Sequence, residues 1–114
     1  MLTARCYRVR PEGLARLKAW LATLSARRAE ATATLLMEGV RWERVFLLDH
    51  PTGTLLIALS ESDDPARARS VHAASTEPID IEHRSVLAEA LGESFPIALE
   101  LELLEEASHD RHPY

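Results

Sequence analysis

Residues 40–61 read VRWERVFLLDHPTGTLLIALSE, and this stretch decides the fold. Its two ends, residues 40–50 and 54–61, are rich in the apolar and β-branched side chains that favour strands. Between them, Pro51, Thr52 and Gly53 form a short segment typical of a tight turn. The stretch therefore predicts a β-hairpin, in which two consecutive strands pair in antiparallel fashion.

The chain before the hairpin predicts one strand and one long helix. Residues 2–10 have the pattern of a strand, which residues 11–13 (Pro-Glu-Gly) break. Apolar side chains then recur with helical spacing, with one gap at Arg28, until Gly39 provides a helix stop. A single helix over residues 14–38 would be about 37 Å long, so we expect it to overhang the sheet or to bend.

The chain after the hairpin predicts two shorter helices. Asp64 can cap a helix that starts with Pro65, because proline is favoured at the first helical position. This helix is expected over residues 65–74. Another is expected over residues 79–91, where Gly92 would end it.

Residues 97–103 carry the clearest strand pattern of the chain, since Ile and Leu alternate there with Ala and Glu. The resulting order of elements predicts an α+β domain of ferredoxin-like βαββαβ type, with a four-stranded antiparallel sheet and helices on one face. We expect one domain over residues 1–106 and a C-terminal tail over residues 107–114.

A sheet with helices on one side leaves its other face open. We expect Arg5 and Tyr7 on this open face, together with the two glutamates of residues 97–103. With Trp42 or Phe46 also there, the face would be too apolar to stay exposed. The sequence therefore predicts a homodimer that pairs through the open sheet face.

Composition and charge exclude several classes of function. The formal net charge is −5 and basic residues are interleaved with acidic ones, which argues against nucleic-acid binding. No uncharged apolar stretch approaches the roughly 20 residues needed to span a membrane. The single cysteine, Cys6, fits the reducing cytoplasm. No glycine-rich phosphate loop or supported cluster of metal-ligating residues is present, so we expect neither a cofactor nor a metal.

Three short motifs carry a resemblance to a known family: EGV at residues 38–40, ERVFL at 43–47 and PIDIEH at 78–83. With them, about residues 2–105 resemble a family of uncharacterised bacterial proteins that is similar in architecture to the dimeric α/β-barrel proteins, which include antibiotic-biosynthesis-type monooxygenases. The resemblance implies a ferredoxin-like protomer whose open sheet face meets that of a partner. It implies no activity, because no motif here matches the catalytic residues of those monooxygenases.

Asp80 and His83 are the first candidate pair for chemistry. Three residues apart near a helix start, they share one helix face, and a carboxylate there can orient an imidazole for acid–base catalysis. The alternative is ordinary helix chemistry, because an acid in the first turn is favoured by the helix dipole and a nearby histidine can simply bond to it.

Glu38 and Glu43 flank the start of the second strand and are candidate ligand-binding residues. Together with Arg28, which interrupts the apolar stripe, they could form a buried polar cluster, either as a site or as a structural salt bridge.

Two hypotheses about function follow. The chain is a small dimeric domain that binds a small molecule or a partner, or it is a cofactor-independent enzyme of oxygenase or isomerase type. In the second case His83 would be the base and Asp80 would orient it.

Overall fold

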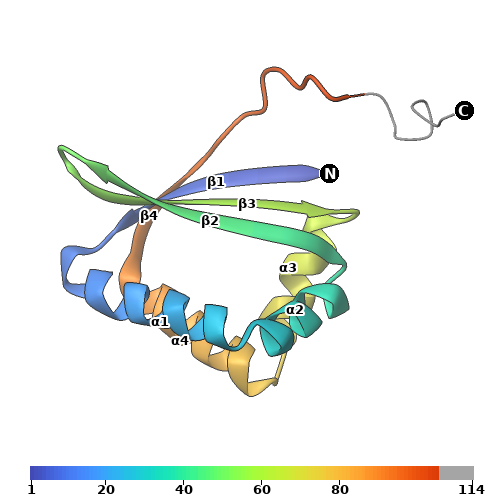
Figure 1. Ribbon diagram of the computed structural model, residues 1–114, viewed down its shortest axis with the longest axis horizontal. Helices are drawn as coiled ribbons and strands as arrows, with labels where there is room; N and C mark the ends of the chain where they lie inside the picture. Colours follow the sequence, from blue (N-terminus) through green and yellow to red (C-terminus); the bar gives the residue numbers. More distant parts are fainter. Residues whose placement is uncertain (106–114) are drawn as a thin grey trace, which may run out of the picture.

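The computed structural model describes residues 1–105 and contains one four-stranded sheet with four α-helices on one side of it (Figure 1). The strands are β1 (Leu2–Val9), β2 (Val40–His50), β3 (Gly53–Ser62) and β4 (Leu91–Pro96). The helices are α1 (Leu14–Ala26), α2 (Arg28–Met37), α3 (Pro65–Ala74) and α4 (Pro78–Ala90), and a 3-10 turn covers Pro11–Gly13. The strand order is β2-β3-β1-β4 and every pairing is antiparallel. The predicted ferredoxin-like α+β fold is confirmed. No helix within the described residues is long and apolar enough to cross a membrane.

The helix predicted over residues 14–38 is divided at Arg27 into α1 and α2, so the expected bend is a complete break. This residue leaves helical geometry, with φ −103° and ψ 37°, and its guanidinium binds Glu30 and Glu82. Ala31 and Thr34 of α2 and Glu38 directly after it face inward, whereas Arg28, at the gap in the apolar stripe, is exposed.

The strand predicted over residues 97–103 is wrong for the single chain. Strand β4 begins directly after α4, where Leu91 pairs with Val9. It then runs along β1 as far as Arg5, which pairs with Pro96. By the time the chain reaches Ile97, whose N–H binds the carbonyl of Ala4, only the first residues of β1 remain to pair with. Gly92 therefore lies inside β4 and does not end a helix.

The register of the strands separates the two faces of the sheet. Leu56 belongs to the buried core, and its register neighbours Leu47 and Tyr7 pack against that core, so this row faces the helices. Arg5 lies two residues from Tyr7 and shares its side, so the expectation that both would lie on the open face is wrong. The two glutamates at positions 100 and 102 lie beyond β4, outside the sheet.

The open face is apolar. Its central row crosses all four strands in register and consists of Phe46, Ile57, Cys6 and Phe95. The next residues of β2 on this side are Leu48 and Arg44, followed by Trp42, whose ring is covered by the guanidinium of Arg44. Phe46 and Leu48 are 50% and 44% exposed, respectively.

Gly13 fixes how the start of α1 packs on α4. A Cβ atom added there would lie 2.7 Å from the Cα of Ala90, which is fully buried. We expect Gly13→Ala to lower the free energy of unfolding by about 1–3 kcal/mol, because backbone atoms must move to relieve the overlap. Chemical denaturation measures this loss.

Gly92→Ala is the matched control for this substitution, since its Cβ would meet nothing closer than the Arg8 carbonyl oxygen at 3.5 Å. We expect it to change the stability little. Equal losses in the two variants would contradict the packing role of Gly13.

Candidate functional site

A cavity of about 700 Å³ lies between the sheet and the helices. Its walls are mostly apolar and come from β1, β2, β3 and all four helices, and residues 97–99 border it beside the first half of β1, which pairs with β3 but not with β4. Its polar lining includes five ionisable side chains of interest: Glu38, Glu43, His72, Asp80 and His83. An apolar cavity with a few polar groups gathered together is typical of a small-molecule site.

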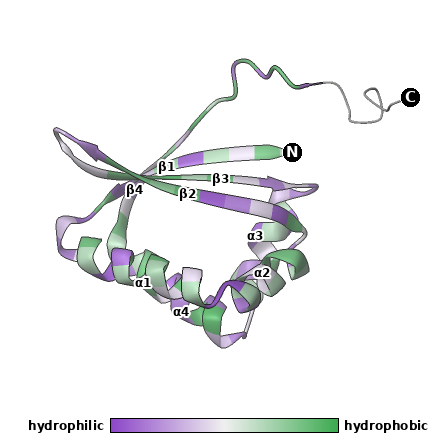
Figure 2. Ribbon diagram, in the orientation of Figure 1, coloured by the Kyte–Doolittle hydropathy of each residue, from purple (hydrophilic) through white to green (hydrophobic). Residues whose placement is uncertain are grey.

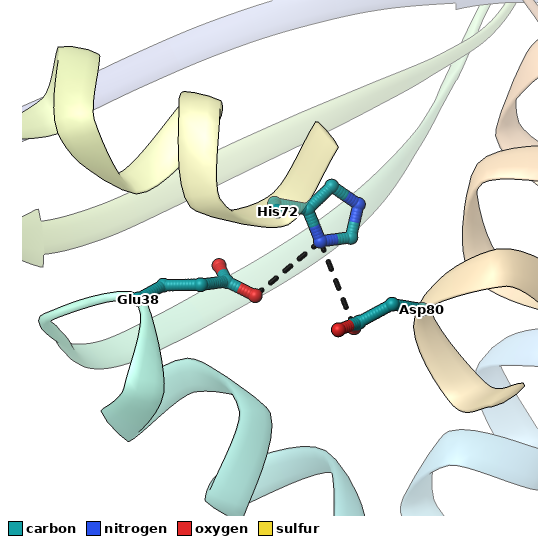
Figure 3. Close-up of side chains that lie close together, drawn as sticks. All are labelled: Glu38, His72 and Asp80. Atoms are coloured by element: carbon teal, nitrogen blue, oxygen red, sulfur yellow. Dashed lines mark hydrogen bonds and ion pairs between the residues drawn. The ribbon is translucent and has the colours of Figure 1, made fainter. Parts of the chain in front are cut away.

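Three of these side chains meet at the junction of three helices (Figure 3). His72, in the last turn of α3, lies with its Nδ1 3.3 Å from Glu38 Oε2 and 3.6 Å from Asp80 Oδ1. Glu38 follows directly after α2 and Asp80 lies in the first turn of α4. Both carboxylates are buried, with 8% and 6% of their surface exposed. We refer to Glu38, His72 and Asp80 as the α-junction cluster.

Neighbouring hydrogen bonds hold the α-junction cluster in place. The hydroxyl of Ser75 donates to Asp80 Oδ2 at 2.6 Å. The guanidinium of Arg84 donates to the backbone carbonyls of His72 and Ser75, which fixes the end of α3 against α4. These bonds give the carboxylate of Asp80 and the backbone of His72 defined positions.

The two carboxylates change the acidity of His72. Its hydrogen bond with Glu38 raises the pKa of the imidazole above 6.5, and the charges of Glu38 and Asp80 add to this effect, although partial burial acts against it. At neutral pH the ring is therefore more often an imidazolium than an ordinary histidine is. Because Nδ1 faces the carboxylates, the remaining donor is the Nε2–H group, which points away from both in Figure 3.

The α-junction cluster also has the composition of a metal-ligand set. One ligand atom from each of its three residues can be chosen so that all lie within 4.8 Å of one another. A divalent cation there would have to displace the proton that His72 holds between the carboxylates. The two carboxylates that raise the pKa of His72 would also attract a divalent cation, so a proton and a cation compete for the cluster.

His83 has the opposite electrostatic character. Its Nδ1 accepts a hydrogen bond of 2.8 Å from the indole N–H of Trp20, so the neutral ring carries its proton on Nε2. Burial lowers the pKa of His83 to about 4, and the positive charge of His72 acts in the same direction. The two imidazole rings pack edge to face, with centroids 5.7 Å apart. His83 is thus a neutral N–H donor beside His72, whose pKa is raised.

Asp80 does not make the pair with His83 that the sequence suggested. Within residues 1–105, its hydrogen bond comes from Ser75 and its ion pair is with His72. The structure therefore assigns to His72 the carboxylate-oriented position that was expected for His83. Sequence spacing gave no signal for His72, because it lies on another helix, eight residues before Asp80.

Of the two remaining predicted site residues, Glu43 lines the cavity and Arg28 does not. Glu43 lies on β2, lines the cavity and is exposed to solvent. The protein around it, which removes part of its hydration, and the charge of Glu38 raise the pKa of Glu43. Arg28 is exposed on α2 and is not part of the cavity lining. Glu38 and Glu43 thus come together, and Arg28 does not join them.

Solved structures share the fold at low sequence identity. Tetracenomycin F2 cyclase from Streptomyces glaucescens, a type II polyketide cyclase, aligns with a TM-score of 0.51 and 22% identity over 91% of this chain and 86% of the cyclase chain. Rv0793 from Mycobacterium tuberculosis aligns with a TM-score of 0.51 and 17% identity over 93% of this chain and 97% of the other. Both likenesses concern the fold alone.

Sequence comparison places the chain in a family. No curated protein sequence matches it at a significant level. The model of the family DUF6176, described as a family of unknown function, matches residues 2–112. The chain therefore belongs to the DUF6176 family.

Proposed function

We propose that this protein is a cofactor-independent enzyme of isomerase type that transfers protons within a small, largely apolar carbonyl compound. The observation that carries the proposal is His72, which is held between two buried carboxylates and lines an apolar cavity of about 700 Å³. Perturbed acid–base groups that gather in a cavity are typical of catalytic sites.

Three side chains supply the steps of a keto–enol interconversion. The carboxylate of Glu43, made more basic by its raised pKa, accepts a proton from the carbon next to the carbonyl group. The imidazolium of His72 donates its Nε2 proton to the carbonyl oxygen as the electron pair of the broken C–H bond moves toward that oxygen. The neutral His83 Nε2–H stabilises the developing charge by a hydrogen bond. Reversal of these steps on another carbon completes the isomerisation and restores both catalytic groups.

Hydrogen–deuterium exchange in the substrate tests this function without knowledge of the natural compound. Apolar ketones and 1,3-dicarbonyl compounds, including polyketide-like ones since a protein of the same fold is a polyketide cyclase, are incubated with the protein in D₂O. We expect the protein to accelerate loss of the proton signal next to the carbonyl group of at least one compound that binds. Compounds that bind with no accelerated exchange would contradict the enzyme and favour the alternative of a binding protein.

We further propose that the protein works as a homodimer that pairs through the open sheet face. The support is the apolar row on that face, with Phe46 half exposed beside Leu48. A continuous apolar surface of this kind is costly to leave in water. We expect a particle of twice the chain mass of 12.7 kDa in sedimentation equilibrium.

A further inference from the structure

Arg5 is a charged side chain on the side of the sheet that faces the helices. It lies in register between Ala58 of β3 and Pro96 of β4, and it lines the cavity while remaining exposed to solvent. Ala58 packs against the core, so this wall is otherwise used for apolar contacts. Figure 2 shows hydrophobic and hydrophilic residues together along β1. Within residues 1–105 the guanidinium has no hydrogen-bond or ion-pair partner, so its place on this wall favours a negatively charged ligand.

The fold itself explains the positions of several other arginines. The guanidiniums of Arg10 and Arg84 donate to backbone carbonyls, and that of Arg41 donates to two carboxylates. These contacts hold elements of the chain together. Arg5 makes no contact of this kind within the described residues, so its guanidinium donors are available to a molecule in the cavity.

Arg69 is the other arginine of the cavity lining. It lies on α3 three residues before His72, so both side chains share one face of that helix. An anion at Arg69 would therefore lie close to Glu38 and Asp80, whose negative charges repel it. Arg5 lies on the sheet, whereas both carboxylates lie at the ends of helices, so an anion at Arg5 experiences less of this repulsion.

Two hydroxyl groups lie beside Arg5 on the same wall. Thr3 is two residues away on β1 and therefore points to the same side as Arg5, and its Oγ1 lies 2.8 Å from Ser60 Oγ. This contact uses one of the two hydroxyl protons, and the other has no acceptor within the described part of the chain. A guanidinium and an O–H donor on one wall match the two oxygens of a carboxylate.

We propose that Arg5 and the hydroxyl pair of Thr3 and Ser60 bind a carboxylate of the substrate, which makes the substrate an oxo acid with an apolar body. This deepens the proposed function and rests on it, because the carbonyl group of the substrate then lies at the catalytic side chains of that proposal. One of them, Glu43, is on β2 and Arg5 is on β1, with β3 between them, so two strand spacings separate the groups by about 10 Å. Oxo acids whose carboxylate and carbonyl groups are several carbons apart fit this distance, and short ones do not.

Calorimetry on the full chain compares linear oxo acids of increasing length, starting from levulinate, with their methyl esters. In the wild type we expect the best-fitting acid to bind at least about tenfold more tightly than its ester, because hydrogen bonds to a charged group contribute that factor. Arg5→Gln should remove this preference and keep the affinity for the ester within a few-fold, which also shows that the variant folds. Arg5→Lys keeps the charge without the planar fork and should retain part of the preference.

Arg8→Gln is the matched control, because Arg8 is an exposed residue of the same strand that lies on the open face and does not line the cavity. We expect it to keep the wild-type preference for the acids.

Equal binding of acids and esters, or no binding of any acid, would overturn the proposal, as would a preference that survives Arg5→Gln. A preference lost in Arg69→Gln and kept in Arg5→Gln would move the anion to α3 and overturn it as well. Acids that bind through Arg5 without accelerated deuterium exchange would support the carboxylate site and contradict the proposed isomerase, so the two failures are distinct.

Discussion

Replacing His72 with glutamine is expected to lower the rate of protein-catalysed deuterium exchange in a bound carbonyl compound by about 10²–10⁴-fold. Glutamine keeps a polar side chain of similar length but provides no acidic proton. It can still donate a hydrogen bond to Glu38, which the histidine Nδ1 contacts at 3.3 Å. The rate is measured by proton NMR in D₂O, and binding of the same compound is measured separately by calorimetry.

The control for this variant is His50→Gln, which changes an exposed histidine of the hairpin that bonds only to Thr52 within the described part of the chain. We expect it to exchange at the wild-type rate. Exchange by His72→Gln within a few-fold of wild type, with binding retained, would contradict the role of His72 as the acid.

Acidification from pH 7 to pH 4 is expected to cost the fold about 3 kcal/mol through His83 alone. The pKa of this group is about 4 in the folded protein against 6.5 for an unperturbed histidine. Below pH 6.5 the unfolded chain therefore binds a proton that the folded protein does not, so stability falls as the pH falls toward 4. The raised pKa of His72 acts in the other direction. Its contribution still grows as the pH falls from 7 through 6.5, which offsets part of the loss, and it does not change further toward pH 4.

His83→Gln isolates this effect. The glutamine carbonyl can still accept the hydrogen bond from the Trp20 indole, and the side chain does not titrate. Urea denaturation at pH 7 and pH 4 should show a loss of stability on acidification that is smaller by about 3 kcal/mol than in the wild type. The same loss in both proteins would show that His83 is not held neutral.

The fold was predictable from local patterns, and the site was predictable only in part: Glu38, Glu43, Asp80 and His83 line the cavity, whereas Arg28 does not and His72 was not expected there. The hairpin over residues 40–61 and the helix Pro65–Ala74 were predicted closely, because turn residues and a capping Asp64 act over a few positions. The division of the first helix at Arg27 is accompanied by ion pairs with Glu30 and Glu82, the second of which is 55 residues away. No local pattern contains that information.

The two remaining errors have a common physical origin. Residues 97–103 were expected to pair because their alternation is strong, but β4 pairs with β1 before this segment is reached. His72 was not among the predicted site residues, because its environment is created by Glu38 and Asp80, which follow α2 and begin α4. In both cases tertiary contacts decide which residue takes a role that sequence spacing suggests for another.

The central claim is that the cavity holds a charged His72 beside a neutral His83, and a pH titration of the histidine ring signals by NMR tests it most directly. The account predicts a pKa above 6.5 for His72, which Glu38→Gln should lower, and a pKa of about 4 for His83. Two histidines that both titrate near 6.5, with no response of His72 to Glu38→Gln, would contradict it.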